Sequence, residues 1–271
     1  MDFKNKVVII TGASSGIGKA CAIELASRGA NLVLAARQYV TLCELTAELE
    51  KQYQIKAVAV QADVSKEADC EFLIKQAIMT FSRIDVLINN AGLSMRALFN
   101  DLDLSVLKNL MDVNFWGTVY CSKFALPEIL KTKGTIVGVS SIAGYRGLPG
   151  RTGYSASKFA MNGFMEALRT ELLKTGVNVL VACPGFTASN IRVAALAENG
   201  EAHGETSMEE GKMMLPETVA KIIVDGIASR KRTLVMTGQG KLTVWLNKLL
   251  PGLADNLVFK HFTKEKHALI K

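Results

Sequence analysis

Short apolar stretches alternate along the chain with longer segments whose apolar residues recur at helical spacing. The apolar stretches predict strands at residues 7–11, 31–36, 57–61, 86–89, 134–140 and 178–183, with a weaker one at 233–236. Helices are predicted at 16–27, 39–53, 67–81, 104–130 and 154–173. Because the strands are continuously apolar instead of alternating, they are typical of a parallel sheet covered by helices on both faces. The sequence therefore predicts an α/β fold with a doubly wound, mostly parallel sheet.

Two regions depart from this alternation. Residues 186–215 are polar, rich in Ala and Glu, and follow directly after a predicted strand. Since ligands of doubly wound sheets bind beyond the carboxyl ends of the strands, we expect this segment to form a substrate lid. Residues 241–271 are basic and apolar, with a helical spacing that ends at Pro251. No repeat or low-complexity linker divides the chain, so we predict one domain over residues 1–240 followed by a C-terminal extension.

The positive charge of the chain is unevenly placed. Apolar residues make up 49% and charged residues 21% of the 271 positions, which excludes a disordered chain. From Arg230 onward there are nine Lys or Arg against Asp255 and Glu265, whereas the preceding residues balance at 23 against 23, so the net +7 lies in the last segment. A protein that binds nucleic acid carries its basic residues on a binding face, so this distribution argues against that class.

The sequence also bears on location and metal binding. No apolar run approaches the roughly 18 residues needed to span a bilayer, and the first strand begins too early for a secretory signal to precede it. The five cysteines are scattered without a C-x-x-C pair, as in reduced cytoplasmic proteins. The three histidines lie in polar or terminal segments. We therefore predict a cytoplasmic protein without a metal site.

A glycine-rich turn connects the first predicted strand to the first predicted helix. Gly12, Gly16 and Gly18 have the spacing G-x-x-x-G-x-G. Glycines at such a turn let the backbone approach a pyrophosphate, which then meets free amides at the helix N-terminus. The commoner G-x-G-x-x-G pattern is only half matched, and a plain turn is the alternative. The position after the first strand of a Rossmann-type chain favours dinucleotide binding.

The end of the second predicted strand bears on cofactor choice. Folds that bind NAD usually carry an acidic residue there for the ribose 2′-hydroxyl. This chain has Ala36, Arg37 and Gln38 instead. A guanidinium offers paired donors to a phosphate and keeps its charge. We therefore predict NADP(H) as the cofactor, with a solvated loop arginine as the alternative.

Tyr154 and Lys158 open a helical segment, and their four-residue spacing places the phenol and the ammonium on one face. A cation beside a phenol favours the phenolate, so the tyrosine can exchange a proton with an alcohol or carbonyl oxygen. Ser140 and Ser141 close a strand thirteen residues earlier, where a hydroxyl can bond the same oxygen. Taken alone, the pair Y-x-x-x-K is a weak signal.

Taken together, these motifs resemble the short-chain dehydrogenase/reductase family up to about residue 190. The glycine turn resembles its T-G-x-x-x-G-x-G loop, residues 89–92 match its N-N-A-G segment, and Pro184 and Gly185 match its P-G turn. The resemblance implies a catalytic set of Asn114, Ser141, Tyr154 and Lys158. It implies a cofactor-binding set of Gly12, Ser14, Ser15, Gly16, Ile17, Gly18, Arg37, Asp63, Val64, Asn90, Ala91, Gly92, Tyr154, Lys158, Pro184, Gly185 and Thr187.

The resemblance also implies a role for each catalytic residue. Tyr154 is the acid and base, and Ser141 polarises the carbonyl. Lys158 lowers the pKa of the tyrosine and bonds the nicotinamide ribose. Asn114 holds a water in a proton relay through Lys158, and its alternative is a helix-interior amide bonded to neighbouring main chain. The hydride itself passes between the cofactor and the carbonyl carbon.

These features predict an NADPH-dependent oxidoreductase that interconverts a carbonyl and a secondary alcohol on an apolar or lipid-like substrate. The expected lining is Leu93, Met95, Ile142, Leu148, Pro149 and Phe186. Arg96 and Arg146 are either ligands for an anionic group or solvated surface residues. The alternatives are a non-catalytic regulatory protein that senses NADP(H), and a hydroxysteroid or lipid-alcohol dehydrogenase that uses NADP⁺.

Two further expectations concern partners. The resemblance implies a homodimer or homotetramer. The extension over residues 241–271 either packs on the active-site mouth or a neighbouring subunit, or lies on a membrane surface with lysines facing anionic headgroups.

Overall fold

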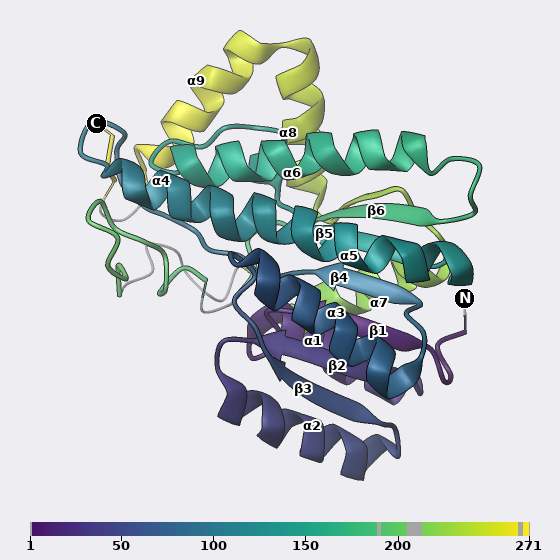
Figure 1. Cartoon of the computed structure of the whole chain (residues 1–271). Coiled ribbons are helices and arrows are strands. Elements are labelled where there is room, and N and C mark those ends of the chain that lie inside the picture. Colours follow the sequence, from purple (N-terminus) through teal and green to yellow (C-terminus); the bar gives the residue numbers. More distant parts are fainter. Residues whose placement is uncertain (1, 189–190, 205–212, 265–267, 271) are drawn as a thin grey trace.

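The computed structural model describes residues 2–188, 191–204, 213–264 and 268–270 (Figure 1). Its centre is a parallel sheet of seven strands in the order β3-β2-β1-β4-β5-β6-β7. The strands are β1 (Val7–Thr11), β2 (Asn31–Ala36), β3 (Ala57–Gln61), β4 (Val86–Asn89), β5 (Thr135–Val139), β6 (Asn178–Cys183) and β7 (Thr233–Val235). The predicted doubly wound parallel sheet is therefore confirmed.

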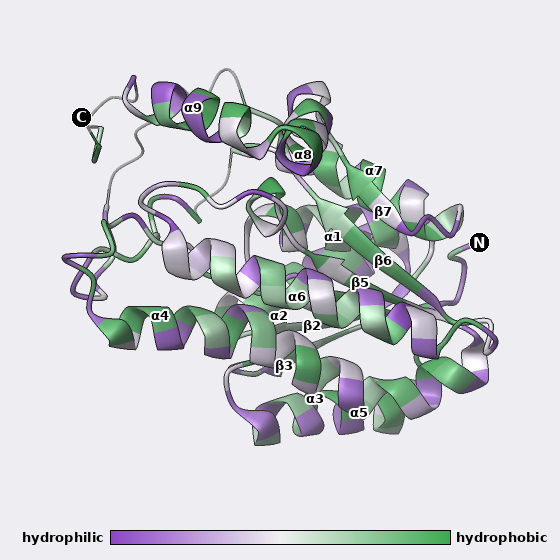
Figure 2. Ribbon diagram, turned by 90° about the horizontal axis from the view of Figure 1, so that it is seen from above, coloured by the Kyte–Doolittle hydropathy of each residue, from purple (hydrophilic) through white to green (hydrophobic). Residues whose placement is uncertain are grey.

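Helices cover both faces of this sheet. They are α1 (Gly16–Ser27), α2 (Tyr39–Tyr53), α3 (Glu67–Phe81), α4 (Leu104–Leu110), α5 (Gly117–Thr132), α6 (Thr152–Glu171), α7 (Pro216–Ala228), α8 (Gly238–Leu249) and α9 (Pro251–Phe262). Successive strand residues point to opposite faces, so Val8 and Ile10 pack with α1, α2 and α7, whereas Val7 and Ile9 pack with α3, α5 and α6. Both faces are buried, which explains why the strands are continuously apolar; Figure 2 shows hydrophobic β6 between α7 and α6.

The direction of winding reverses between β1 and β4, and the carboxyl ends of these two strands are pinned together. The Asn90 side-chain amide donates to the main-chain oxygens of Thr11 (2.9 Å) and Gly12 (3.1 Å). In return, the Thr11 hydroxyl accepts from the amides of Asn90 (3.0 Å) and Ala91 (3.1 Å). A reversal of this kind opens a crevice at the sheet edge, where doubly wound folds bind ligands.

The helix predicted over residues 104–130 is interrupted. A π-helical turn over Met111–Trp116 separates α4 from α5, and α5 continues to Thr132. Single π turns insert one extra residue into a helix and are frequent at functional sites. Residues 216–228 carry no predicted helix, yet they form α7, whose Val219, Ile223 and Ile227 are fully buried.

The segment predicted as a lid is tethered at its described parts. The Met214 amide donates to the Phe186 oxygen (2.9 Å), so the segment leaves and rejoins the sheet edge at one place. Farther along, the Leu196 amide donates to the Ser94 oxygen (2.9 Å). Residues 189–190 and 205–212 of this segment lie outside the described residues.

The C-terminal extension forms a helical hairpin of α8 and α9 (Figure 1, yellow). Pro251 does not simply end a helix as predicted: it is the first residue of α9, a position that suits proline because its nitrogen needs no acceptor there. The Asn247 amide donates to the Tyr145 oxygen (2.9 Å), and Arg146 donates to Asn247 (2.8 Å) and to Asp255. The hairpin therefore packs on the loop that follows β5. None of the described helices is long and apolar enough to cross a bilayer.

Candidate active site

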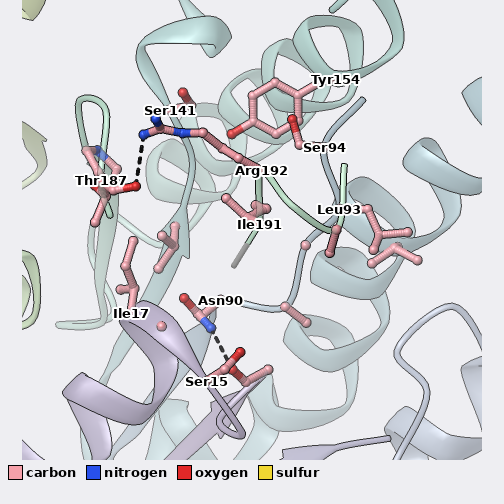
Figure 3. Close-up of a pocket in the computed structure, with 18 of the residues that line it drawn as sticks. Ser15, Ile17, Asn90, Leu93, Ser94, Ser141, Tyr154, Thr187, Ile191 and Arg192 are labelled. Atoms are coloured by element: carbon pink, nitrogen blue, oxygen red, sulfur yellow. Dashed lines mark hydrogen bonds between the residues drawn. The ribbon is translucent and has the colours of Figure 1, made fainter. Parts of the chain in front are cut away.

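A cleft of about 490 Å³ lies at the carboxyl ends of the strands. Its lining brings together Gly12, Ser14, Ser15, Gly16, Ile17, Arg37, Asp63, Val64, Asn90, Ala91, Gly92, Ser141, Tyr154, Lys158, Pro184, Gly185 and Thr187. Two of the residues predicted for the site, Gly18 and Asn114, do not line it. Figure 3 shows Ser15 and Ile17 on one side of the cleft and Ser141 and Tyr154 on the other.

The glycine turn forms one end of the cleft. Gly12 has a φ of +65°, and a Cβ at this position would lie 2.8 Å from the Ala91 Cα, so only glycine fits. Ser15 precedes α1 with an extended backbone, and its side chain does not cap the helix. The first amides of α1 therefore remain available to an anion, and no acidic residue stands in the first turn.

Gly18 has a packing role instead of the predicted contact with the cofactor. A Cβ on this residue would lie 2.3 Å from the Gly12 oxygen and 2.5 Å from the Asn90 side-chain nitrogen. Its lack of a side chain lets α1 approach the pinned ends of β1 and β4. Gly18, the third glycine of the motif, thus permits the close packing of α1 against the turn.

Arg37 and Asp63 lie at the same end of the cleft as the glycine turn. The Arg37 side chain is exposed, and the neighbouring Ala36 is 9% exposed. The Asp63 carboxylate accepts from the Ser65 amide (3.1 Å) and hydroxyl (2.8 Å), which fixes its orientation beside Val64. A cation and an oriented carboxylate therefore stand where the second and third strands end.

Asn114 is fully buried in the π-helical turn, and its side-chain amide makes three hydrogen bonds. Its oxygen accepts from the Leu93 amide (2.8 Å), and its nitrogen donates to the Leu93 oxygen (2.9 Å) and the Ser157 hydroxyl (2.8 Å). The contacts with Leu93 are those of an amide bonded to neighbouring main chain, and the relay water stays a prediction. Asn114 fixes the loop after β4 against α6.

Tyr154 and Lys158 lie one turn apart on α6, as predicted, with the Lys158 nitrogen 5.9 Å from the centre of the Tyr154 ring. Lys158 is 3% exposed, and its ammonium donates to the Val139 oxygen (2.9 Å). Because burial disfavours the charged form, the pKa of Lys158 falls to about 8. Ser141 accepts from the Ala143 amide (3.1 Å), so its own hydroxyl proton can be donated elsewhere.

Burial and several neighbouring groups act on the pKa of Tyr154. Burial raises the pKa of this phenol, and the hydrogen bond with Ser141 and the charges of Arg151 and Arg192 oppose that rise. The Lys158 ammonium lies beside the Tyr154 ring and donates a hydrogen bond to the Val139 oxygen at the end of β5. The effect of Lys158 on the pKa of Tyr154 stays a prediction.

The residues that the sequence analysis missed include Ser94, Arg151, Ile191 and Arg192, which also line the cleft. Arg192 donates to the Thr187 oxygen (2.9 Å), and its guanidinium carbon lies 5.4 Å from the centre of the Phe186 ring (Figure 3). Arg151 lies in the same way 5.3 Å from the ring of Phe262. In the sequence, only the positions of these arginines point to the site. Arg151 lies three residues before Tyr154, and Arg192 lies five residues after Thr187.

Several predicted substrate contacts lie elsewhere. Leu93, Leu148 and Phe186 line the cleft, but Met95, Ile142 and Pro149 do not. Met95 is fully buried, and Ile142 packs where a Cβ on Gly240 of α8 would lie 2.6 Å from it.

The two arginines that sequence analysis considered as anion ligands also lie outside the cleft. Arg96 bonds the His203 ring (3.1 Å), and Arg146 holds the C-terminal hairpin.

The buried ammonium predicts how stability depends on pH. The unfolded chain binds more protons than the folded protein between the Lys158 pKa of about 8 and the ordinary 10.5. The stability present above this window is therefore lost as pH falls through it. We therefore compare the unfolding free energy of the wild type with that of a Lys158→Met variant. We expect the wild-type value minus the variant value to be larger at pH 10 than at pH 7 by roughly 2 kcal/mol. Denaturant titrations at both pH values measure this; an unchanged difference would contradict it.

Matches to known proteins agree with this geometry. The family model described as short chain dehydrogenase matches residues 6–200. The 11-beta-hydroxysteroid dehydrogenase-like 4A of Arabidopsis thaliana is 37% identical over 255 residues, which cover 92% of this chain and 82% of the relative.

Two solved structures share the fold over most of their length. A short chain dehydrogenase/reductase from Burkholderia phymatum in complex with NAD has a TM-score of 0.84 and 25% identity, and the match covers 93% of this chain and 96% of that one. An alcohol dehydrogenase from the archaeon Thermococcus sibiricus complexed with 5-hydroxy-NADP has a TM-score of 0.75 and 26% identity, over 85% and 95% of the two chains. The chain therefore belongs to the short-chain dehydrogenase/reductase family of oxidoreductases.

Proposed function

We propose that this protein is an NADP(H)-dependent oxidoreductase that interconverts a carbonyl and a secondary alcohol. The observation that carries the proposal is one continuous cleft with the glycine turn at one end and Ser141, Tyr154 and Lys158 at the other. The residues fit a dinucleotide, because Gly12 permits the tight turn at the end of the cleft and no side chain caps the first amides of α1. The nicotinamide, when bound, supplies or accepts the hydride.

The side chains of the cleft then handle the proton. In the direction of reduction, the Tyr154 hydroxyl donates its proton to the substrate oxygen as the hydride reaches the carbon. The Ser141 hydroxyl donates a hydrogen bond to the same oxygen and holds it beside the phenol. The Lys158 ammonium has three N–H groups. One donates a hydrogen bond to the Val139 oxygen, and the other two are available to ribose hydroxyls. In oxidation the proton takes the opposite course.

The preference for NADP(H) rests on Arg37. Its side chain lines the cleft with Asp63 and Val64, at the end where an adenosine ribose follows from the position of the glycine turn. No acidic residue occupies positions 35–38, so nothing there selects a free 2′-hydroxyl. The solved relatives were bound to NAD and to 5-hydroxy-NADP, so the choice depends on this chain's own residues.

An apolar substrate body is supported by the lining. Leu93, Leu148, Phe186 and Ile191 surround the catalytic end of the cleft. The relative named as a hydroxysteroid dehydrogenase-like protein supports a lipid alcohol or ketone as one such substrate.

The proposed acid and base is tested by Tyr154→Phe. We expect turnover to fall by at least about 100-fold, because general acid catalysis supplies a factor of this size, while NADPH binding is retained. NADPH oxidation is followed over ketosteroids, acyl ketones, β-ketoacyl thioesters and quinones, and binding by NADPH fluorescence. Tyr145→Phe, in the loop that follows β5 and outside the cleft, is the control. Undiminished turnover by Tyr154→Phe would remove this residue from the mechanism.

The cofactor preference is tested by Arg37→Asp. Loss of a charge-assisted hydrogen bond, worth about 1.5–3 kcal/mol, predicts that the NADPH-to-NADH affinity ratio falls roughly 10- to 100-fold. Titration of each cofactor into the protein measures the ratio. Arg37→Gln separates the loss of the cation from the gain of a carboxylate. A ratio unchanged in both variants would place the 2′-phosphate elsewhere.

A peripheral contact between the α8–α9 hairpin and an anionic membrane is also supported. Leu242, Trp245 and Leu249 lie on one face of α8, and Leu253 and Leu257 on one face of α9; each is about half exposed. Lysines at 241, 248, 260 and 264 accompany this apolar surface. Apolar side chains at headgroup depth with lysines around them are the arrangement that binds anionic lipid.

The membrane contact is tested by the double variant Trp245→Asp and Leu253→Asp. We expect cosedimentation with phosphatidylserine vesicles at low salt to fall at least tenfold, since both changes put a carboxylate on the apolar surface. Met79→Asp, on the exposed side of α3, is the control and should bind as the wild type does. Failure of the intact protein to bind such vesicles would end the proposal.

A further inference from the structure

A buried serine lies between Tyr154 and Lys158 on α6. Ser157 is fully buried and is not among the described residues of the cleft lining. Its hydroxyl donates to the Tyr154 main-chain oxygen (2.8 Å) and accepts from the Asn114 side-chain nitrogen (2.8 Å). This one hydroxyl therefore joins the helix that carries Tyr154 to the π-helical turn.

Asn114 extends this connection to the loop that follows β4. Its side-chain oxygen accepts from the Leu93 amide (2.8 Å), and its nitrogen donates to the Leu93 oxygen (2.9 Å). Leu93 and its neighbour Gly92 line the cleft. A Cβ on Gly92 would lie 3.1 Å from the Asn114 side-chain oxygen and 3.6 Å from the Lys158 nitrogen, so the loop packs closely against both. A chain of hydrogen bonds thus connects the cleft wall at Leu93 to the main chain of Tyr154.

The bond between Asn114 and Ser157 is the weak point of this chain. Both bonds with Leu93 go to a single residue, so they let the Asn114 amide move together with the loop. Among the described hydrogen bonds of this amide, only the one to Ser157 reaches α6. Leaving a buried donor without its partner costs more than the bond itself contributes. A shift of about 1 Å at a reacting group can lower a rate roughly 100-fold.

We propose that Ser157 is a positioning residue for the reaction: by holding Asn114, it fixes the Tyr154 hydroxyl relative to the cleft wall at Leu93. Ser157 lies too deep to act on the substrate itself, so it works through the two residues that it bonds. This inference rests on the oxidoreductase function proposed above and adds to it a residue that holds the acid and base in place.

Ser122 on α5 provides a matched control. Its hydroxyl accepts from the Asn89 side-chain nitrogen (3.1 Å), and the residue is 2% exposed, so it accepts the same kind of hydrogen bond at a similar depth. Neither Ser122 nor Asn89 is among the described residues of the cleft lining. Ser122→Ala and Ser157→Ala therefore both remove a buried bond from an asparagine, but only Ser157→Ala removes one that leads to Tyr154.

Hydrogen exchange tests the connection without turnover. The Leu93 amide is protected by the Asn114 side chain. In Ser157→Ala this amide should exchange about tenfold faster than in the wild type, as expected from the loss of one buried hydrogen bond. Ser122→Ala should leave its exchange rate unchanged. Nuclear magnetic resonance of the full chain without cofactor measures both rates, and a wild-type rate at Leu93 in Ser157→Ala would overturn the proposal.

The effect on the reaction is measured with the best carbonyl substrate of the NADPH-oxidation screen. We expect kcat of Ser157→Ala to fall roughly 10- to 100-fold. The substrate KM and the NADPH dissociation constant should keep their wild-type values, because the displaced group is the proton donor. Ser122→Ala should lose unfolding free energy as Ser157→Ala does and yet keep the wild-type kcat. An unchanged kcat in Ser157→Ala, or an equal fall in Ser122→Ala, would overturn the positioning role and leave the oxidoreductase function standing.

A double-mutant cycle tests whether Ser157 acts through Asn114. If it does, the double variant Asn114→Ala and Ser157→Ala should have the same kcat as Asn114→Ala alone, because the bond between them is already lost. Losses that multiply in the double variant would overturn the proposal. A wild-type protein that reduces no compound of the screen would instead refute the oxidoreductase function, and the positioning role would fall with it.

Discussion

The junction between the carboxyl ends of β1 and β4 is the constraint on which the rest of the structure depends. Asn90 joins the two strand ends through the oxygens of Thr11 and Gly12, and Thr11 returns two hydrogen bonds. Gly18 lets α1 press on this junction from behind. The reversal of strand order opens the crevice there, so a small group of polar contacts determines both the shape of the cleft and the direction of the first helix amides.

The catalytic end is built at some expense in stability. Lys158 keeps an ionisable group in a buried position, and within the described part of the chain its one hydrogen bond goes to Val139. Burial disfavours charge on the lysine and on Tyr154 alike, so a core made for stability alone would carry neither. Residues of this kind are expected where function sets the requirement and the surrounding sheet supplies the stability.

Local sequence patterns predicted most of the helices and strands. The side-chain contacts that they missed depend on segments that are distant in the sequence. Strands buried on both faces and a glycine turn after the first strand are visible in the sequence because each depends on neighbouring residues alone. The hydrogen bonds of Asn114 with Leu93 and Ser157 join three separate parts of the chain. Arg151 is likewise placed by Phe262, more than a hundred residues away. No local spacing carries such information, so these side-chain contacts could not be predicted from the sequence.

The hydrogen bonds of Arg146 connect the C-terminal hairpin to the catalytic end of the cleft. Arg146 bonds Asn247 of α8, Asn247 bonds the Tyr145 oxygen, and this loop starts at Ser141. The α9 residue Phe262 supports Arg151 in addition. A displacement of the hairpin therefore reaches Ser141 through residues 141–145 and reaches Arg151 through its contact with Phe262. Helices α8 and α9 therefore support the catalytic end of the cleft. Binding of a partner to these helices would alter the shape of that end.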